Sequence, residues 1–497
     1  MNTAVLIVGA GPTGLTLACT LARAHVPVRI VDKSPAFHRE SRAKGPNQRS
    51  REVFADLGVG EAFDAAGVER TVLRKYRDGV AIADHEIFGD QRPTPAAPYA
   101  KGLSLPQWRT EEILRDRLAA YGVRVEPGCE VTAVEQDGEG VTAVLADGRR
   151  IGAAYAVGCD GGRSPVRKAL GVPFVGETEA EECMAVGDVE ADGLDRGYWH
   201  QWFDEDGAIM LWPIPGTASW QLQGTVEPGT TPTLESFQRL FDRHARVPGV
   251  RLANPTWVST YRVNVRMAER FRAGRVFLAG DAAHVQPIAG GLGMNTGIQD
   301  AFNLGWKLAL VAQGLAGEGL LGTYESERMP IASWVLRTAD ERMRAVLERV
   351  REAGVGTEVV VDRAATGLGL GYPWSPLSHG GLGARLGLQM GDRAPDSPCR
   401  DALSGRGTRL FEAFAGPHFT LLGFGANSAA ALAEVAGRCP RIVRTLLLDD
   451  RDDGEARTAY GVEGDALVLV RPDNHLALAG APADAPHIVR YLNGLGR

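Results

Sequence analysis

The chain of 497 residues has few cysteines, no long apolar run and no long basic run. Its six cysteines are scattered and none forms a CxxC or a metal-ligand spacing, so we expect buried, reduced thiols rather than a disulfide framework. No stretch reaches the roughly 18 consecutive apolar residues that a membrane helix needs. The apolar start Val5–Val8 lacks a basic flank and a cleavage pattern, which speaks against a signal peptide and predicts a cytoplasmic protein.

The charge balance and composition indicate which kinds of protein and ligand to expect. Acidic residues outnumber basic ones by 61 to 54, and the net charge of −7 argues against nucleic acid or an anionic membrane as a partner. Hydrophobic residues make up 44 % of the chain, as in globular proteins. At roughly 150 residues per domain, the length predicts two to four domains. Small molecules are therefore the expected ligands.

The N-terminal segment has the pattern of a βαβ unit. A β-prone run, Ala4–Val8, precedes the turn Gly9-Ala10-Gly11-Pro12-Thr13-Gly14, an amphipathic run Leu15–Ala24 follows, and a second apolar strand, Val28–Val31, ends at Asp32. Glycines in this spacing allow a tight turn and let a pyrophosphate approach a helix N-terminus. An acidic residue after the second strand is placed to accept hydrogen bonds from a ribose diol. The unit predicts dinucleotide binding.

The rest of the first 176 residues indicates a mainly parallel sheet with an antiparallel insert. The expected elements are a helix near Ile113–Ala119, short strands at Val123–Glu126, Val131–Val134 and Val141–Leu145 with turns at Asp137-Gly138 and Asp147-Gly148, and a strand from Tyr155. An aromatic-rich alternation from about 176 to 270 predicts an antiparallel sheet. A buried strand, Arg275–Ala279, and a long helix, Asn295–Gln313, follow it.

The C-terminal part indicates a separate small α/β domain. A Gly/Pro-rich stretch, Gly367–Gly383, is typical of an interdomain linker. Beyond it we expect strands at Phe419–Phe424, Thr445–Leu448, Ala466–Val470 and Leu476–Ala479, and a closing helix near Pro486–Leu492.

Three motifs together resemble one family, the FAD-dependent aromatic hydroxylases of the para-hydroxybenzoate hydroxylase fold. They are the GxGxxG unit ending in Asp32, the segment Cys159–Arg167, similar to the family's DG motif for FAD and NAD(P)H, and Gly280–Pro287 continuing to Gly297, similar to its GD motif. The segments Gly391–Asp396 and Leu469–Asp473 are similar to the thioredoxin-like C-terminal domain of the phenol and polyketide hydroxylase branch. Without a CxxC, no dithiol chemistry is expected there.

The resemblance implies an α/β protein with four segments: a Rossmann-like FAD-binding domain in two parts, 1–176 and 271–375, an antiparallel substrate domain, 177–270, and the thioredoxin-like domain, 385–497. It implies FAD, NADPH or NADH, and O2 as cofactors, and a flavin C4a-hydroperoxide that hydroxylates a phenolic or polyketide-type ring. We expect a monomer or homodimer.

The same resemblance implies which residues contact the cofactor: Gly9, Gly11, Pro12, Thr13, Gly14, Asp32, Lys33, Arg42, Gln107, Val131, Asp160, Asp281, Pro287, Gly291, Gly293, Met294 and Asn295. The glycines near 291 allow the backbone to approach the flavin ring. The positive end of the helix that begins near Asn295 can stabilise the negative charge of reduced flavin. For His284 in the GD motif we favour a structural hydrogen bond over proton transfer.

Substrate contacts are expected from the short strands of the middle sheet. The candidates are Trp199, Gln201, Met210, Trp212, Gln221 and Gln223, with His200 considered beside them. Because a phenol must lose its proton to become a good nucleophile, a base or relay is also expected, but the sequence does not identify it.

Other functions stay open at this stage. A Baeyer–Villiger or epoxidising monooxygenase on the same fold is the main alternative. A flavin-dependent halogenase would be expected to show Trp-x-Trp-x-Ile-Pro, where this chain has Met210–Pro215. A redox-silent flavin-binding module would lack NAD(P)H oxidation that rises with an aromatic substrate.

Overall fold

The computed structural model describes residues 3–69, 71–89, 91–204, 207–227, 229–286, 291–353, 365–380, 386–448 and 454–497. No helix in these ranges combines the length and the hydropathy that crossing a bilayer requires. Four of the cysteines, Cys19, Cys129, Cys399 and Cys439, are buried free thiols as predicted, whereas Cys159 is partly exposed. The side chain of Cys183 lies outside the described residues.

The first sheet is built around the predicted βαβ unit. Its strands run in the order β14 (Arg272–Ala273), β15 (Val276–Leu278), β8 (Arg150–Gly158), β1 (Thr3–Val8), β2 (Val28–Val31) and β5 (Val125–Glu126). All neighbours from β15 to β5 pair in parallel. The antiparallel insert is the pair β6 (Val131–Gln136) and β7 (Val141–Leu145), which joins β8. The strands from β15 to β2 are almost wholly apolar because helices cover the sheet.

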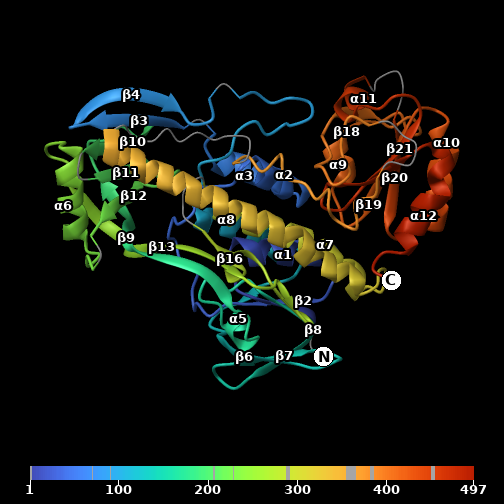
Figure 1. Cartoon of the computed structure of the whole chain (residues 1–497), viewed down its shortest axis with the longest axis horizontal. Coiled ribbons are helices and arrows are strands. Elements are labelled where there is room, and N and C mark those ends of the chain that lie inside the picture. The colour runs from blue at the N-terminus through green and yellow to red at the C-terminus, as the bar shows by residue number, and fades with distance from the viewer. Residues whose placement is uncertain are drawn as a thin grey trace.

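Helices α1 (Pro12–Arg23) and α7 (Gly293–Ala312) pack closely against each other. A Cβ added to Gly305 would lie 2.6 Å from Cγ2 of Thr20, so only glycine permits this approach. The other helices of this part are α2 (Gln48–Asp56), α3 (Gly60–Ala66), α4 (Gln107–Ala120), α5 (Pro165–Ala169) and the long α8 (Gly319–Ala353), with a 3-10 turn η1 (Gly280–Ala282). Figure 1 shows α8 crossing the molecule from the C-terminal domain to the second sheet.

The second sheet has eight strands. They run in the order β16 (His284–Val285), β13 (Leu252–Ala268), β9 (Phe174–Ala191), β12 (Ser219–Val226), β11 (Gly207–Pro213), β10 (Tyr198–Asp204), β3 (Val72–Arg77) and β4 (Val80–Glu86). The pairing is antiparallel as expected, except that β10 and β3 are parallel. The sequence analysis did not anticipate that β3 and β4, from the first 176 residues, extend this sheet. Helix α6 (Leu234–Ala245) covers one face.

The C-terminal domain contains the four predicted strands in a mixed sheet. Their order is β20 (Val443–Leu448), β19 (Phe419–Phe424), β21 (Ala466–Val470) and β22 (Leu476–Gly480). Around it lie β17 (Pro398–Arg400), β18 (Gly407–Arg409), α9 (Leu410–Phe414), α10 (Ser428–Arg438), α11 (Gly454–Tyr460), η2 (Pro482–Asp484) and α12 (Ala485–Asn493). Figure 1 places this domain at one end of the molecule.

The C-terminal domain shares a hydrophobic core with α7 and α8. Trp306 and Leu310 of α7 and Leu320 of α8 are buried against Phe419 and Leu421 of β19. The stretch predicted as a linker is irregular in its described residues, 367–380, but it is packed: Tyr372 and Leu377 are buried. The C-terminal domain therefore packs directly against α7 and α8 and is not joined to them by a linker alone.

Candidate functional site

The GxGxxG motif and the GD motif meet at Thr13. A Cβ on Gly280 would lie 2.5 Å from Oγ1 of Thr13, and a Cβ on Gly297 would overlap the same atom. The first residues of α1, the η1 turn and the first turns of α7 therefore lie in direct contact. Neither α1 nor α7 has a side-chain N-cap, so backbone N–H groups of two helix N-termini are open in one region. Such groups favour negatively charged ligand atoms.

The GxGxxG turn has the close approaches that its glycines predict. Gly9 has φ +104°, and a Cβ there or at Gly14 would overlap a backbone carbonyl oxygen, of Cys159 and Gly9 respectively. A Cβ at Gly11, in contrast, would meet no protein atom within 4 Å. Pro12 is the buried first residue of α1. The turn is thus tightly packed on its inner side and open at Gly11.

Asp32 is oriented by the backbone around it. Its Oδ2 accepts a hydrogen bond from the Ala10 N–H at 2.7 Å, and its Oδ1 accepts one from the Ser34 N–H at 2.8 Å. Lys33 beside it is exposed. Val131 is a buried core residue, two positions after Cys129, whose N–H donates to the Asp32 carbonyl. The Val131 side chain therefore packs inside the domain, near the end of β2.

The DG segment is tied to the GD segment by an arginine. Asp160 accepts hydrogen bonds from Ser164 Oγ at 2.5 Å and from the Val166 N–H at 3.0 Å, which fixes the start of α5. Burial raises the pKa of the Asp160 carboxyl, and these two bonds oppose the rise. Arg167 donates from Nη1 to the Ala282 carbonyl at 2.8 Å. The sequence analysis did not single out this link.

The carboxylate of Asp281 differs from those of Asp32 and Asp160 because no described protein group binds it. It is exposed, and within the described part of the chain it has no hydrogen-bond partner. Desolvation by the surrounding protein nevertheless raises its pKa, against the nearby His284 and Arg42 charges. Asp281 is therefore an exposed carboxylate that neighbouring protein groups partly desolvate.

Behind Asp281, a buried ion pair holds the turn. Asp300 accepts the Gly280 N–H at 3.0 Å, lies 2.7 Å from Nε2 of His284, and accepts Nε of Arg328 at 2.6 Å. Burial opposes ionisation of Asp300, but the Arg328 and His284 charges and bonds lower its pKa to about 2. His284 makes the structural hydrogen bond that the sequence analysis favoured.

The N-terminus of α7 is anchored to residues 45–47. Asn295 accepts the Asn47 N–H at 2.9 Å and donates to the carbonyls of Gly291 and Gly45. Its side chain is thus occupied by protein groups. Gly291 has φ +64° and is exposed, Gly293 and Met294 are partly exposed, and Pro287 lies outside the described residues.

One residue of this region was missed by the sequence reasoning. Both polar atoms of the Gln286 side-chain amide are buried without a hydrogen-bond partner. A Cβ on Gly293 would lie 3.2 Å from Gln286 Nε2, so the amide faces the first turn of α7. Buried polar groups are normally paired, so an amide without a partner among the described residues fits a polar group of a ligand. Its position inside the GD segment was the available signal.

Arg42 and Gln107 come from the segment between β2 and α2 and from the start of α4, respectively. Arg42, with φ +41°, is exposed and pairs with Glu40. Gln107 donates from its side chain to Glu111 at 2.9 Å and from its backbone to Ser41. Burial raises the pKa of Glu111, and the charge of Arg42 opposes this rise as it does at Asp281. Arg42 is therefore near both carboxylates.

The six candidate substrate residues share one face of the second sheet. Gln201, Met210 and Gln223 are cross-strand partners in one row, and Trp212 and Gln221 in the next. The Trp199 ring stacks on that of Trp212, with centroids 5.4 Å apart. The face is covered by residues 41–44: Gln221 donates to Ser41 Oγ and to the Arg42 carbonyl.

The other face of this sheet is hydrophobic core. Trp202, Leu211, Trp220 and Leu222 pack there against α6. His200 alternates with the candidates and belongs to this face, where its Nδ1 lies 2.7 Å from Oη of Tyr76. Burial lowers the pKa of His200. Its inclusion among the substrate contacts was therefore wrong.

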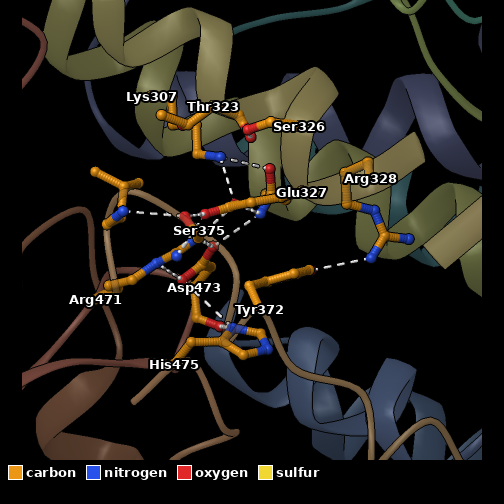
Figure 2. A network of polar contacts seen from close by, with 12 residues as sticks. Lys307, Thr323, Ser326, Glu327, Arg328, Tyr372, Ser375, Arg471, Asp473 and His475 are labelled. Atoms are coloured by element: carbon orange, nitrogen blue, oxygen red, sulfur yellow. Dashed lines mark hydrogen bonds and ion pairs between the residues drawn. The ribbon is translucent and has the colours of Figure 1, made fainter. Parts of the chain in front are cut away.

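A buried charge network joins the C-terminal domain to α7 and α8 (Figure 2). Glu327 of α8 accepts two hydrogen bonds from Arg471, at 2.7 and 2.9 Å, and one from Lys307 of α7 at 2.6 Å. Arg471 also pairs with Asp473, and these side chains are 0–1 % exposed. Tyr372 connects this network to Arg328, which donates to its hydroxyl at 3.0 Å (Figure 2).

Comparison with known proteins agrees with this geometry. Residues 2–339 match the family model described as "FAD binding domain", and residues 388–493 match "Aromatic-ring hydroxylase, C-terminal". The chain is 41 % identical over 488 residues to a flavin-dependent monooxygenase of Mycobacteroides abscessus, covering 95 % of this chain and 96 % of that protein. It is 36 % identical to 6-methylpretetramide 4-monooxygenase of Streptomyces rimosus, covering 99 % and 93 %.

A solved structure of a hydroxylase has the same overall fold as this chain. The structure of aklavinone-11 hydroxylase with FAD and aklavinone superimposes with a TM-score of 0.84 at 28 % identity, covering 99 % of this chain and 98 % of that one.

Proposed function

Because this chain belongs to the FAD-dependent aromatic-ring hydroxylases, we propose that it hydroxylates a polycyclic phenol of the aromatic polyketide type. It is a flavoprotein monooxygenase that uses NAD(P)H and O2. The substrate class is supported by relatives named for pretetramide and anhydrotetracycline oxidation and by the complex with aklavinone. The proposal includes a cytoplasmic enzyme that acts as a monomer or homodimer, with the domain boundaries given by the sequence analysis except that β3 and β4 belong to the second sheet.

The residues around Thr13 and Asp281 fit FAD. The open space at Gly11 and the uncapped N-terminus of α1 suit the pyrophosphate. The Asp32 carboxylate suits a ribose hydroxyl, and the unpartnered Asp281 carboxylate suits the hydroxyls of the ribityl chain. The unpaired Gln286 amide and the N-terminus of α7 suit the polar edge of the flavin ring.

We assign the remaining predicted cofactor residues to the same site with different roles. The proposal assigns cofactor contacts to Thr13, Arg42, Gln107, Gly291, Gly293, Met294 and the exposed Lys33. Asn295 acts through its backbone, because its side chain is occupied. Asp160 holds the DG turn, and Val131 packs beneath it.

When bound, FAD supplies the two-electron reduction by NAD(P)H and the activation of O2. The chain's own residues orient the substrate and exclude water. The partly exposed Trp199 offers a flat apolar surface for an aromatic ring. Trp212, Gln201, Gln221 and Gln223 form the buried layer behind it, under segment 41–44. The covering segment 41–44 closes the face of the sheet toward the FAD-binding part.

The open carboxylate of Asp281 is the observation that carries this proposal. We expect Asp281→Ala to weaken FAD binding at least about tenfold, the effect of losing hydrogen bonds to a charged group, measured by titrating the apoprotein with FAD and following flavin fluorescence. Asp242→Ala, an exposed position on α6, is the matched control. Full flavin occupancy of Asp281→Ala, with normal NADPH oxidation, would contradict the assignment.

The substrate class is tested separately. NADPH consumption by the holoenzyme should rise with polycyclic phenols, and product analysis should find one added oxygen on a ring carbon. Oxygen inserted beside a ketone would instead establish the Baeyer–Villiger alternative.

A further inference from the structure

Lys44 lies on the substrate face of the second sheet, although it belongs to the FAD-binding part. Its Nζ is 3.6 Å from the centre of the Trp212 ring, 5.3 Å from that of Trp199 and 4.0 Å from Sδ of Met210. Its carbonyl accepts a hydrogen bond from the Leu105 N–H, which fixes the backbone of the covering segment. Three of the candidate substrate residues therefore surround one ammonium group.

No carboxylate of the described residues forms a salt bridge with Lys44. Asp188 of β9, the acidic residue in the row of Trp212 and Gln221, accepts both the N–H and Oγ of Ser41. Glu40 is paired with Arg42. The indole faces and a thioether leave the positive charge without an anion, although a cation–π contact compensates in part.

The pKa of Lys44 agrees with an ammonium group that is surrounded by apolar groups. Burial lowers the pKa of Lys44 from 10.5 to about 7, and desolvation is the one cause. The other charged groups of the vicinity are Asp188, Arg42 and Lys75, the last being a buried residue of β3 opposite Gln201 on the same face. At neutral pH a large fraction of Lys44 is therefore an amine that can accept a proton.

We propose that Lys44 binds the acidic hydroxyl of the aromatic substrate and takes its proton, an assignment that rests on the proposed function. The O–H bond of the substrate breaks, an N–H bond forms at Nζ, and the ammonium then stays beside the phenolate oxygen. The indole of Trp199, which is partly exposed, stacks on the ring. Lys44 thereby supplies the base that ring hydroxylation needs and selects rings that carry an ionisable hydroxyl.

A cavity borders the Lys44 cluster at Trp199. Trp199, whose ring centre is 5.3 Å from Nζ of Lys44, lines a cavity of about 180 Å³ with Tyr198, Arg196 and Ile214. Lys44 is a partly exposed residue, although its ammonium is desolvated by burial. A substrate ring held against Trp199 would bring its hydroxyl toward Nζ, which forms no salt bridge among the described residues.

The test compares two probes on the holoenzyme. Alizarin, a dihydroxyanthraquinone, changes colour when a hydroxyl ionises, and its dimethyl ether has no acidic hydroxyl. We expect Lys44→Met to weaken alizarin binding about tenfold and to raise by about one unit the pH at which the bound dye ionises. Binding of the dimethyl ether should stay unchanged, and Lys44→Arg should recover part of the alizarin affinity.

A charge-loss control and flavin measurements complete the experiment. Lys168→Met, at an exposed position on α5, should leave binding of both probes unchanged. Equal loss of both probes in Lys44→Met, unchanged ionisation of the bound dye, loss of FAD, or no binding of either probe to the wild-type holoenzyme would overturn the assignment. Failure of the proposed function differs, because the wild type would then neither take up FAD nor oxidise NADPH.

Discussion

Nε of Arg328 donates to Oδ1 of Asp300 at 2.6 Å, and both side chains are 0 % exposed. Through Asp300 this ion pair holds the Gly280 N–H and His284, and so fixes the turn that presents Asp281. Through Tyr372 it meets the network that anchors the C-terminal domain (Figure 2). The turn of the proposed FAD site and the docked domain therefore depend on the same pair of helices.

Arg328→Met should destabilise the protein strongly. The substitution leaves the Asp300 carboxylate buried without its cation, and breaking a buried pair in this way costs about 3–5 kcal/mol. Because the Gly280 turn loses support, FAD affinity should fall as well. Urea denaturation and FAD titration measure the two effects. Arg438→Met, which breaks an exposed pair with Glu434, should cost less than about 1 kcal/mol. Similar stabilities of the two variants would refute this account.

Two glycines of the first turn should respond differently to alanine. A Cβ at Gly14 overlaps the Gly9 carbonyl, so Gly14→Ala should destabilise the apoprotein by about 1–3 kcal/mol or more. A Cβ at Gly11 meets no protein atom, so Gly11→Ala should leave apoprotein stability unchanged and weaken FAD binding, since the methyl group occupies cofactor space. Thermal unfolding of the apoproteins and FAD titration separate the two. Wild-type FAD affinity in Gly11→Ala would place the pyrophosphate elsewhere.

The predictions from sequence were most accurate where a pattern is local. The strand, glycine turn and helix at the N-terminus follow from neighbouring residues, and so do the four strands of the C-terminal sheet. Strands β3 and β4 were missed because few of their side chains are buried, so their sequence lacks a clear apolar alternation. Helix α8 contains Pro330, and because proline normally ends a helix, the sequence does not indicate one continuous helix here.

In the site, too, local motifs were predictable and contacts between distant residues were not. The motifs identified Asp32, Asp160 and Asp281, but not which of these carboxylates stays open, because that depends on Ser164, Val166 and other contacts. Lys44 lies two positions after the exposed Arg42 and directly before Gly45, and such a sequence resembles a solvated loop. Only the packing of that segment on Trp212 shows its environment. Glu327 and Arg471 are 144 positions apart, and their pairing has no local signal.

Arg471→Met should weaken the attachment of the C-terminal domain. It removes the cation shared by Glu327 and Asp473. Glu327 then keeps Lys307, Asn303 and Ser375 as donors, and Asp473 keeps the neutral donors Asn303 and Trp306. We expect a loss of about 3–5 kcal/mol and faster proteolysis between 365 and 380, measured by limited digestion. The double variant Glu327→Gln/Arg471→Met should recover part of the loss. No recovery, or wild-type resistance of the single variant, would argue against a shared network.

The Asp300 carboxylate should make stability depend on acid pH. Its pKa in the folded state, about 2, is below the unfolded value near 4, so its contribution is complete above pH 4 and is lost as the pH falls from 4 to 2. Asp300→Asn should therefore be less stable than the wild type by about 3 kcal/mol at pH 7, and the difference should shrink below pH 4. Urea denaturation at a series of pH values measures it. A difference that is constant with pH would show that ionisation of Asp300 does not contribute.

Lys44 should have the opposite effect on stability. Its folded pKa of about 7 is below the unfolded value near 10.5, so the desolvated ammonium destabilises the protein fully below pH 7 and the penalty disappears as the pH rises toward 10.5. Lys44→Met, which keeps the length of the side chain without the charge, should stabilise the apoprotein at pH 6 by on the order of 1 kcal/mol, and the gain should vanish near pH 10. Melting temperatures of both proteins across this range measure the effect. A variant that is less stable than the wild type at pH 6 would mean that the indole contacts outweigh desolvation, so that the charge at this position serves structure rather than a substrate anion.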